Sequence, residues 1–295
     1  MITIEAPYRI QPLSTFQILR LAITQDLKPT DDEICLDFSR TNFVEAAGIV
    51  SLANLIDWLR ARMVTVTYTG CDPQRAAISY LDDTGFFAAF WGTPLTVYAR
   101  NRSTTYPFRQ LECADSHQWI DGNVFPWIAN RCGVPERAFD EFKACIRELF
   151  NNIKDHSTLE IGCMHVQEYP NVSKMKIAVS DFGVGIPHEV RKVVPNISDP
   201  AAIIQATKEG FTSKPGGRNM GAGLSYLIDN VVCRNHGSVS IYSGTGQGHF
   251  RRAANGSRNE SVALSQTYYP GTLVSMTLRT DMIVVPQEDS GEEPW

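Results

Sequence analysis

Residues 174–187 read KMKIAVSDFGVGIP, and this stretch decides the fold. Its first seven residues are rich in apolar side chains, which is typical of a buried strand. Asp181 follows the strand, and Gly183 and Gly185 allow the backbone to turn and to approach a flat group closely. A carboxylate at such a strand end can accept a hydrogen bond from an amino group in a closed pocket. A plain strand–glycine turn accounts for the same residues, so other motifs must decide.

A second motif, ELFNNIKDH at residues 148–156, lies on a helix that we expect from Pro135 to His156. At about 3.6 residues per turn, Glu148, Asn152 and Asp155 fall on one stripe of this helix. Such a stripe can bring a carboxylate and an amide oxygen to a metal-bound phosphate. A solvated helix face is the alternative interpretation of these polar residues.

A third motif, GGRNMGAGL at residues 216–224, enters another expected helix. Unpaired amides at a helix start, with glycines that permit close approach, form an anion site suited to phosphates. The motif is not a Walker A loop, because no Gly-Lys-Ser/Thr follows at the required spacing. It is not a dinucleotide-binding fingerprint either, because no strand directly precedes it.

In this order and at these separations, the three motifs resemble those of the GHKL ATPase superfamily. That group includes DNA gyrase, histidine kinases, bacterial anti-sigma serine kinases and a mismatch-repair ATPase. The resemblance spans about residues 118–280, and residues 237–243 and 270–274 look like the two closing strands of its fold. It implies a Bergerat α/β sandwich of mixed sheet and helices, with ATP and Mg²⁺ as cofactors.

The resemblance assigns roles residue by residue. Asn152 looks like the Mg²⁺ ligand, Asp181 like the residue that reads the adenine amino group, and Glu148 like the general base. That base activates water in the ATPases and a substrate hydroxyl in the serine kinases. The spacing Glu148, Asn152, His156 is closest to the anti-sigma kinase version. The residues assigned to the nucleotide are Asn152, Asp155, Asp181, Gly183, Gly185, Ile186, Thr212, Lys214, Gly221, Gly223 and Leu224.

Residues 210–214, GFTSK, resemble the ATP lid of some histidine kinases. Lys214 would pair there with the terminal phosphates as a mobile point charge. An exposed loop lysine is the alternative. We expect residues 210–220 to be a lid that a bound nucleotide orders, because this segment has few apolar anchors.

The first hundred residues alternate strand-like and helix-like segments, which predicts an α/β sheet. Residues 33–90 resemble a STAS domain, the fold of anti-anti-sigma factors. In those proteins a phosphorylated Ser precedes a helix glycine, which corresponds here to Gly48, but Ala46 and Ala47 stand before it. The resemblance therefore implies a domain that docks a protein partner or restrains the ATPase in cis. A structural appendage is the alternative. The segments are strands at 2–5, 33–38, 63–68 and 95–99, and helices at 14–26, 47–62 and 74–81.

The remaining boundaries complete the expected organisation. We expect a STAS-like domain at 1–103, a GHKL ATP-binding domain at 104–280 and a disordered tail at 281–295. Residues 100–118 are expected to be irregular and 251–261 to form a mobile polar loop. The second domain would contain helices at 118–130, 199–207 and 221–235, and strands at 162–168, 174–180, 238–243 and 272–278.

Composition excludes several classes of function. The chain has 295 residues, and its 27 Lys and Arg against 32 Asp and Glu give a net charge of −5. This charge disfavours a dominant, non-specific nucleic-acid role. No apolar run approaches the roughly 18 residues of a membrane span, and no signal peptide is apparent. Seven cysteines without zinc-like spacing indicate reduced thiols in the cytoplasm.

Two functions fit all of these features. The first is a Mg²⁺-dependent ATP-binding enzyme, namely a bacterial regulatory ATPase or a protein serine kinase of partner-switching type. The second is an ATP-switched protein-binding module without significant turnover. A histidine autokinase is disfavoured because no helical hairpin with an acceptor histidine precedes the second half. The expected partners are ATP and a protein that binds the STAS-like domain, and a homodimer is left open.

Overall fold

The computed structural model describes residues 1–156, 161–211 and 223–286. Most of the expected lid, including Thr212 and Lys214, lies outside the described residues, as do Gly221 and the tail from residue 287. The side chains of Asp155 and His156 also lie outside them.

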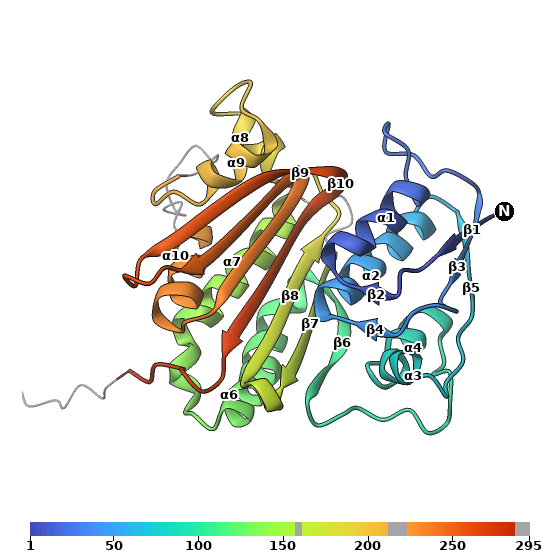
Figure 1. Ribbon diagram of the computed structural model, residues 1–295, viewed down its shortest axis with the longest axis horizontal. Coiled ribbons are helices and arrows are strands. Elements are labelled where there is room, and N and C mark those ends of the chain that lie inside the picture. The colour runs from blue at the N-terminus through green and yellow to red at the C-terminus, as the bar shows by residue number, and fades with distance from the viewer. Residues whose placement is uncertain (157–160, 212–222, 287–295) are drawn as a thin grey trace, which may run out of the picture.

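A five-stranded sheet forms the centre of the molecule (Figure 1). Its spatial order is β6-β7-β8-β10-β9, and all four neighbouring pairs are antiparallel. The expectation of a mixed sheet is therefore wrong. The reason is local, because β7 and β8 are joined by the short turn η3, and β9 and β10 form a long hairpin, both of which require antiparallel pairing. The strands are β6 (Thr105–Glu112), β7 (Ile161–Tyr169), β8 (Lys174–Asp181), β9 (Ser238–Arg252) and β10 (Arg258–Arg279), and η3 is Pro170–Val172.

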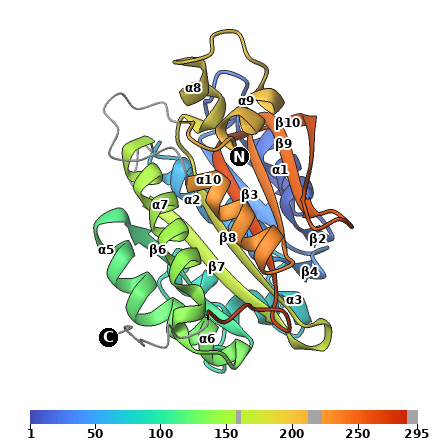
Figure 2. The same cartoon turned by 90° about the vertical axis from the view of Figure 1, so that its left-hand side faces the viewer.

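Helices from the second half of the chain cover one face of this sheet (Figure 2). Helix α7 runs along that face and packs against α10, while α8 and α9 lie at one end of the sheet (Figures 1 and 2). The elements are α5 (Cys113–Trp119), η1 (Ile120–Val124), α6 (Phe125–Cys132), η2 (Glu136–Phe139), α7 (Asp140–His156), α8 (Gly185–Arg191), α9 (Asp199–Ala206), α10 (Gly223–Ile228) and η4 (Asp229–Arg234).

The N-terminal half forms a smaller α/β unit. Its parallel sheet has the order β1-β3-β5, and β2 pairs with β4 in a separate two-stranded sheet. The strands are β1 (Ile2–Glu5), β2 (Arg9–Ile10), β3 (Glu33–Asp37), β4 (Phe43–Val44) and β5 (Thr65–Thr69). The helices are α1 (Pro12–Ala22), α2 (Ala46–Arg60), α3 (Ala76–Asp83) and α4 (Phe86–Trp91).

Helices α1 and α2 of this unit cover the second face of the central sheet (Figure 1). Side chains of a strand alternate between its two faces, and β8 shows the consequence. Ala178 and Phe182 belong to the core beneath the N-terminal helices, whereas Ile177 and Val179 belong to the core beneath α7. Burial on both faces explains the continuous apolar run 177–179 in β8.

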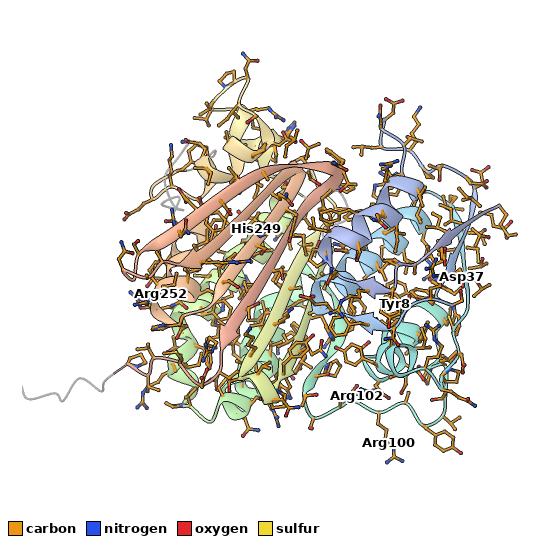
Figure 3. All side chains as sticks on the ribbon, viewed as in Figure 1. Tyr8, Asp37, Arg100, Arg102, His249 and Arg252 are labelled. Carbon is orange, nitrogen blue, oxygen red and sulfur yellow. The ribbon has the colours of Figure 1, made fainter. Side chains whose placement is uncertain are left out.

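The connection between the two halves is held against α3. The backbone N–H groups of Leu95 and Thr96 donate to the Asp82 carboxylate at 2.7 and 2.9 Å. Arg100 N–H and Arg102 Nε donate to Asp83 at 3.0 and 2.8 Å, and Figure 3 shows both arginines along this connection. The strand expected at 95–99 does not form, since carboxylates of α3 take backbone donors that a sheet would use.

Two polar segments prove to be strands. Residues 105–112, expected to be irregular, form the edge strand β6, where Pro107 is tolerated because an edge strand leaves part of its backbone unpaired. The loop expected at 251–261 is the tip of the β9–β10 hairpin, in which Arg252 pairs with Arg258. Residues 259–264 are exposed on both faces of this hairpin, so their side chains show no alternation of polar and apolar residues that would indicate a strand.

Smaller corrections concern helix ends and membrane helices. Ser14 is not the N-cap of α1, because the helix starts at Pro12 and Ser14 Oγ accepts the backbone N–H of Gln11 at 3.1 Å. That helix also ends at Ala22, four residues before the expected Asp26. Within the described ranges, no helix combines the length and the apolar character needed to cross a membrane.

Candidate functional site

Asp181 is a buried carboxylate at the end of β8, with 7% of its surface exposed. By the alternation along β8, its side chain lies on the α7 side of the sheet, because Ile177 and Val179 do. Burial raises the pKa of Asp181 to about 7, and the backbone N–H groups of Thr272 and Gly183 act in the opposite direction. A carboxylate with these two backbone donors keeps further acceptor capacity for a ligand.

Glycines line the space beside this carboxylate. Gly271 has φ +85°, and a Cβ there would lie 2.7 Å from Asp181 Oδ1 and 2.5 Å from the Gly183 nitrogen. Gly185 has φ +78°, and a Cβ there would lie 2.7 Å from Ser243 Oγ. Both positions therefore require glycine on conformational and on steric grounds.

Ser243 holds the turn after Asp181 in place. Its Oγ accepts the backbone N–H of Ile186 at 2.9 Å and donates to the Gly271 carbonyl at 2.6 Å, and the residue is fully buried. No sequence motif pointed to a site role for Ser243, Gly271 or Thr272. In the sequence, the dipeptide Gly271-Thr272 indicated only the start of a closing strand.

Helix α7 carries the second group of predicted residues. Glu148 is half-buried and accepts a hydrogen bond from Asn151 Nδ2 at 3.3 Å. A Cβ at Gly223 would lie 2.9 Å from Glu148 Cγ, so the start of α10 approaches the stem of this side chain closely. Asn152 is half-buried one turn further along, and Leu224 packs against the core beneath α7.

The predicted residues thus fall into two groups on the same side of the sheet. The first consists of Asp181, Gly183, Gly185 and Ile186 at the end of β8. The second consists of Glu148, Asn152, Gly223 and Leu224, where α7 meets α10. Thr212, Lys214, Gly221 and the Asp155 side chain lie outside the described residues, so their placement stays a prediction.

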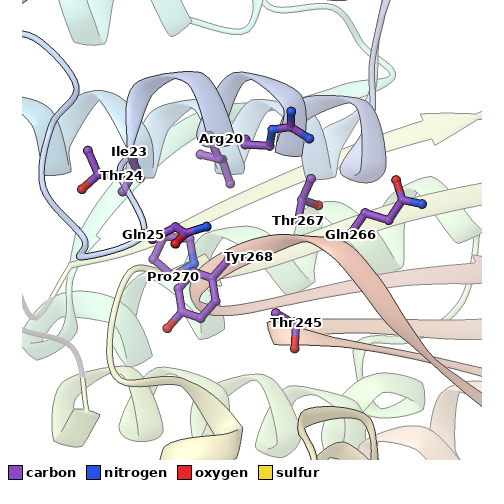
Figure 4. Close-up of a pocket in the computed structure, with 10 residues that line it drawn as sticks. Arg20, Ile23, Thr24, Gln25, Thr245, Gln266, Thr267, Tyr268 and Pro270 are labelled. Atoms are coloured by element: carbon purple, nitrogen blue, oxygen red, sulfur yellow. The ribbon is translucent and has the colours of Figure 1, made fainter.

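A separate cavity of about 380 Å³ opens between the C-terminal end of α1 and the middle of strand β10 (Figure 4). None of the predicted nucleotide residues lines it. Its walls combine apolar side chains, polar amides and hydroxyls, and one cation: Leu19, Arg20, Ile23, Thr24, Gln25, Thr245, Gln266, Thr267, Tyr268 and Pro270.

Comparison with known proteins gives likenesses to solved structures only. No protein-family model matches the chain, and no curated protein matches it. A solved structure that does match is the ATPase region of Saccharomyces cerevisiae topoisomerase II bound to ICRF-187 (dexrazoxane). The two chains are 17% identical with a TM-score of 0.31, over 53% of this chain and 42% of that one. This chain therefore spans less than half the length of that structure.

Proposed function

We propose that this protein is a Mg²⁺-dependent ATP-binding protein of GHKL type. The observation that carries the proposal is Asp181, a buried carboxylate at a strand end beside glycines that leave no room for a side chain at position 271. A buried carboxylate is costly, and the two backbone N–H partners of Asp181 do not cancel the effect of burial on its pKa, so a carboxylate at this place needs a further reason. Hydrogen bonding to the amino group of adenine supplies that reason.

The residues present fit an adenine nucleotide. The Asp181 carboxylate would accept the adenine amino group, whereas guanine presents a carbonyl oxygen to the same acceptor. Gly183 and Gly185, with Ile186, would lie beside the flat base, as close approach requires. Gly221, Gly223 and Leu224 would hold the phosphates at the start of α10, with Thr212, Lys214 and Asp155 contributing from the neighbouring segments.

The Mg²⁺ ion would depend on the nucleotide for most of its ligands. Within the described residues, no group of three or more His, Cys, Asp or Glu side chains is arranged to hold a metal ion. Mg²⁺ is commonly bound through only one or two protein groups, with phosphate oxygens and waters completing its shell. The Asn152 amide oxygen would be the protein ligand in such an arrangement.

We assign Glu148 the role of general base. Its side-chain stem on α7 lies against Gly223, at the start of the helix proposed to hold the phosphates. From there the carboxylate could take a proton from water, giving a regulatory ATPase, or from a serine hydroxyl, giving a partner-switching protein kinase. The STAS-like N-terminal half would bind the protein partner.

A second candidate is an ATP-switched binding module without significant turnover. The observation that favours it is the packing of the N-terminal helices on the sheet that carries Asp181. Nucleotide binding at that sheet could alter the N-terminal surface without any chemical step.

Calorimetry tests the nucleotide site directly. Wild type should bind ATP more tightly than GTP, and Asp181→Ala should lose about 1.5–3 kcal/mol, which is roughly ten- to a hundredfold in affinity. Asp281→Ala is a matched control, because it removes an exposed carboxylate that pairs with Arg279. Equal binding of ATP and GTP, or an Asp181→Ala variant that binds like wild type, would exclude the site.

A second experiment separates the two candidate functions. Glu148→Ala should keep MgATP affinity within several-fold, but should lose turnover by a factor of about 10²–10⁴, the usual contribution of a general base. Phosphate release and phosphorylation of proteins recovered with and without MgATP are the measurements. If wild type shows neither activity while binding ATP, the binding-module function holds instead.

A further inference from the structure

Tyr269 holds both residues that flank Asp181 in the sequence. Its hydroxyl is hydrogen-bonded to Ser180 Oγ, and its ring meets the Phe182 ring edge-on with centroids 5.4 Å apart. Ser180 and Phe182 lie on the N-terminal side of the sheet, opposite to the side of the Asp181 carboxylate. Tyr269 also begins the short segment through Pro270 to Gly271, which contacts Asp181 directly.

The N-terminal helices in turn hold Tyr269 and Ser180. Asn54 Nδ2 of α2 donates to Ser180 Oγ at 2.8 Å, and the Tyr269 hydroxyl donates to Ser51 Oγ of α2 at 3.4 Å. The Phe16 ring of α1 packs on the Tyr269 ring at 5.3 Å between centroids. Ser51, Ser180 and Tyr269 are at most 1% exposed, and Asn54 is 5% exposed.

These hydrogen bonds form one chain with a defined direction. Ser51 Oγ donates its single proton to the Ala47 carbonyl at 2.8 Å, so it accepts from Tyr269. Tyr269 has then used its own proton, and Ser180 must donate to it. Ser180 finally accepts from Asn54. Each hydroxyl donates once, so the loss of one member leaves a buried neighbour with one hydrogen bond unmade.

We propose that Asn54, Ser180 and Tyr269 are positioning residues that hold Asp181 in its binding geometry, so that docking of the N-terminal helices sets nucleotide affinity. The inference rests on the proposed function, because it concerns the same carboxylate. Its physical basis is that the two neighbours of Asp181 are fixed to α2 by a fully buried network. If α2 moves, the end of β8 must find other hydrogen-bond partners or move with it.

Tyr269→Phe is the sharpest test, because it removes the hydroxyl and keeps the ring between Phe16 and Phe182. Tyr80→Phe is the matched control. The Tyr80 hydroxyl is also buried and also joins the two halves, but it contacts His165 on β7 at 3.2 Å, away from Asp181. We expect Tyr269→Phe to weaken ATP binding about three- to tenfold, and Tyr80→Phe to leave it within about twofold.

Two further measurements distinguish positioning from a general loss of stability. In an Asp181→Ala background, Tyr269→Phe should have no additional effect on ATP affinity, since it acts through the missing carboxylate. By reciprocity, MgATP should slow amide hydrogen exchange in residues 46–60 of wild type, and less so in Tyr269→Phe. If Tyr269→Phe folds poorly, Ser180→Ala is the second variant, because it removes the same Ser180–Tyr269 hydrogen bond by changing β8 instead.

The outcomes separate this inference from the proposed function. If wild type binds no ATP, the proposed function and the positioning role are both wrong. If wild type binds ATP and Tyr269→Phe, Ser180→Ala and Tyr80→Phe all bind like wild type, the positioning role is wrong while the nucleotide site stands. If Tyr269→Phe lowers ATP affinity in the Asp181→Ala background as much as it does in wild type, the positioning role is also wrong.

Discussion

The Asp181 carboxyl should make ATP binding dependent on pH. Burial raises its pKa to about 7, so the protonated acid predominates below that pH. Only the ionised form is a full acceptor for the adenine amino group. We therefore expect ATP affinity to fall by up to about tenfold for each pH unit below 7. Calorimetry between pH 5.5 and 8.5 measures this dependence. Asp181→Asn is the control, because it has no carboxyl at this position, so any pH dependence of its ATP affinity comes from the phosphates.

The same carboxyl should affect folding stability in the opposite sense, because the protonated acid favours the folded protein whereas the ionised form favours ATP binding. Its pKa is raised from an ordinary value of 3.8, so the stabilising contribution of the neutral acid is present below that value and lost as pH rises through about 7. Asp181→Asn should therefore raise the melting temperature of the nucleotide-free protein, and more at pH 8 than at pH 5. A gain that is equal at both pH values would show that burial does not raise the pKa of Asp181, which would then be ionised at pH 5 as well as at pH 8.

The turn between β8 and α8 depends on Ser243 of β9. The hydroxyl joins Ile186 to Gly271, and Ser243→Ala would leave a buried N–H and a buried carbonyl without this partner. We expect a loss of about 1–3 kcal/mol in unfolding free energy and weaker ATP binding, because Gly271 contacts Asp181. Ser257→Ala, at the exposed hairpin tip, is the control. Denaturant melts together with calorimetry check both effects, and unchanged ATP binding would separate this turn from the site.

The strand that carries Asp181 was predictable from the sequence because both of its faces are buried. The run at 174–180 signalled β8 because its alternate residues fill two cores. β6 and the outer part of the β9–β10 hairpin were missed, since an edge strand interrupted by Pro107 and a ribbon exposed on both faces have no such pattern. The inner ends of the same hairpin, at 238–243 and 272–278, were predicted. Local motifs likewise indicated Asp181 and Glu148. Tyr269 could not be found this way, because its partner Ser180 is 89 residues away in the sequence.

The start of helix α2 corresponds to the phosphorylation site expected from the STAS resemblance, and here it offers no accessible hydroxyl at positions 46 and 47. Ala46 and Ala47 lack hydroxyls and are 1% exposed, and Glu45 beside them pairs with Lys176 of the central sheet. The neighbouring Thr41 and Ser51 are fully buried. We expect residues 1–100 to stay unphosphorylated here after incubation with MgATP. Mass spectrometry with a synthetic phosphopeptide standard measures this.

One outcome would contradict that expectation about α2. Ser39 is exposed, and its backbone N–H and hydroxyl both bond to Asp37. Modification at Ser39, or at the buried Thr41 or Ser51, would show that this helix start is a phosphorylation switch after all.

At the scale of the whole molecule, the two halves share a core. Helices α1 and α2 pack on Ala178, Phe182, Tyr242, Tyr269 and Leu273 of the central sheet. Separation of the halves would expose these apolar side chains to water, at a cost of about 25 cal/mol for each Å². The resemblances placed a boundary near residue 103 but carried no information on this packing, because it joins residues more than a hundred positions apart.

A protease site inserted between Ser103 and Thr104 tests whether the halves act as one unit. After cleavage of the folded protein, we expect the fragments to elute together, since the buried sheet face and the Asn54–Ser180 contact hold them without the peptide bond. Fragments expressed separately should aggregate, the second one more strongly, because it would expose the whole sheet face. ATP affinity of the cleaved complex should match that of the intact chain. If the two fragments fold separately and do not associate, the shared core contributes little to the stability of the protein. The N-terminal helices then cannot set the geometry of Asp181.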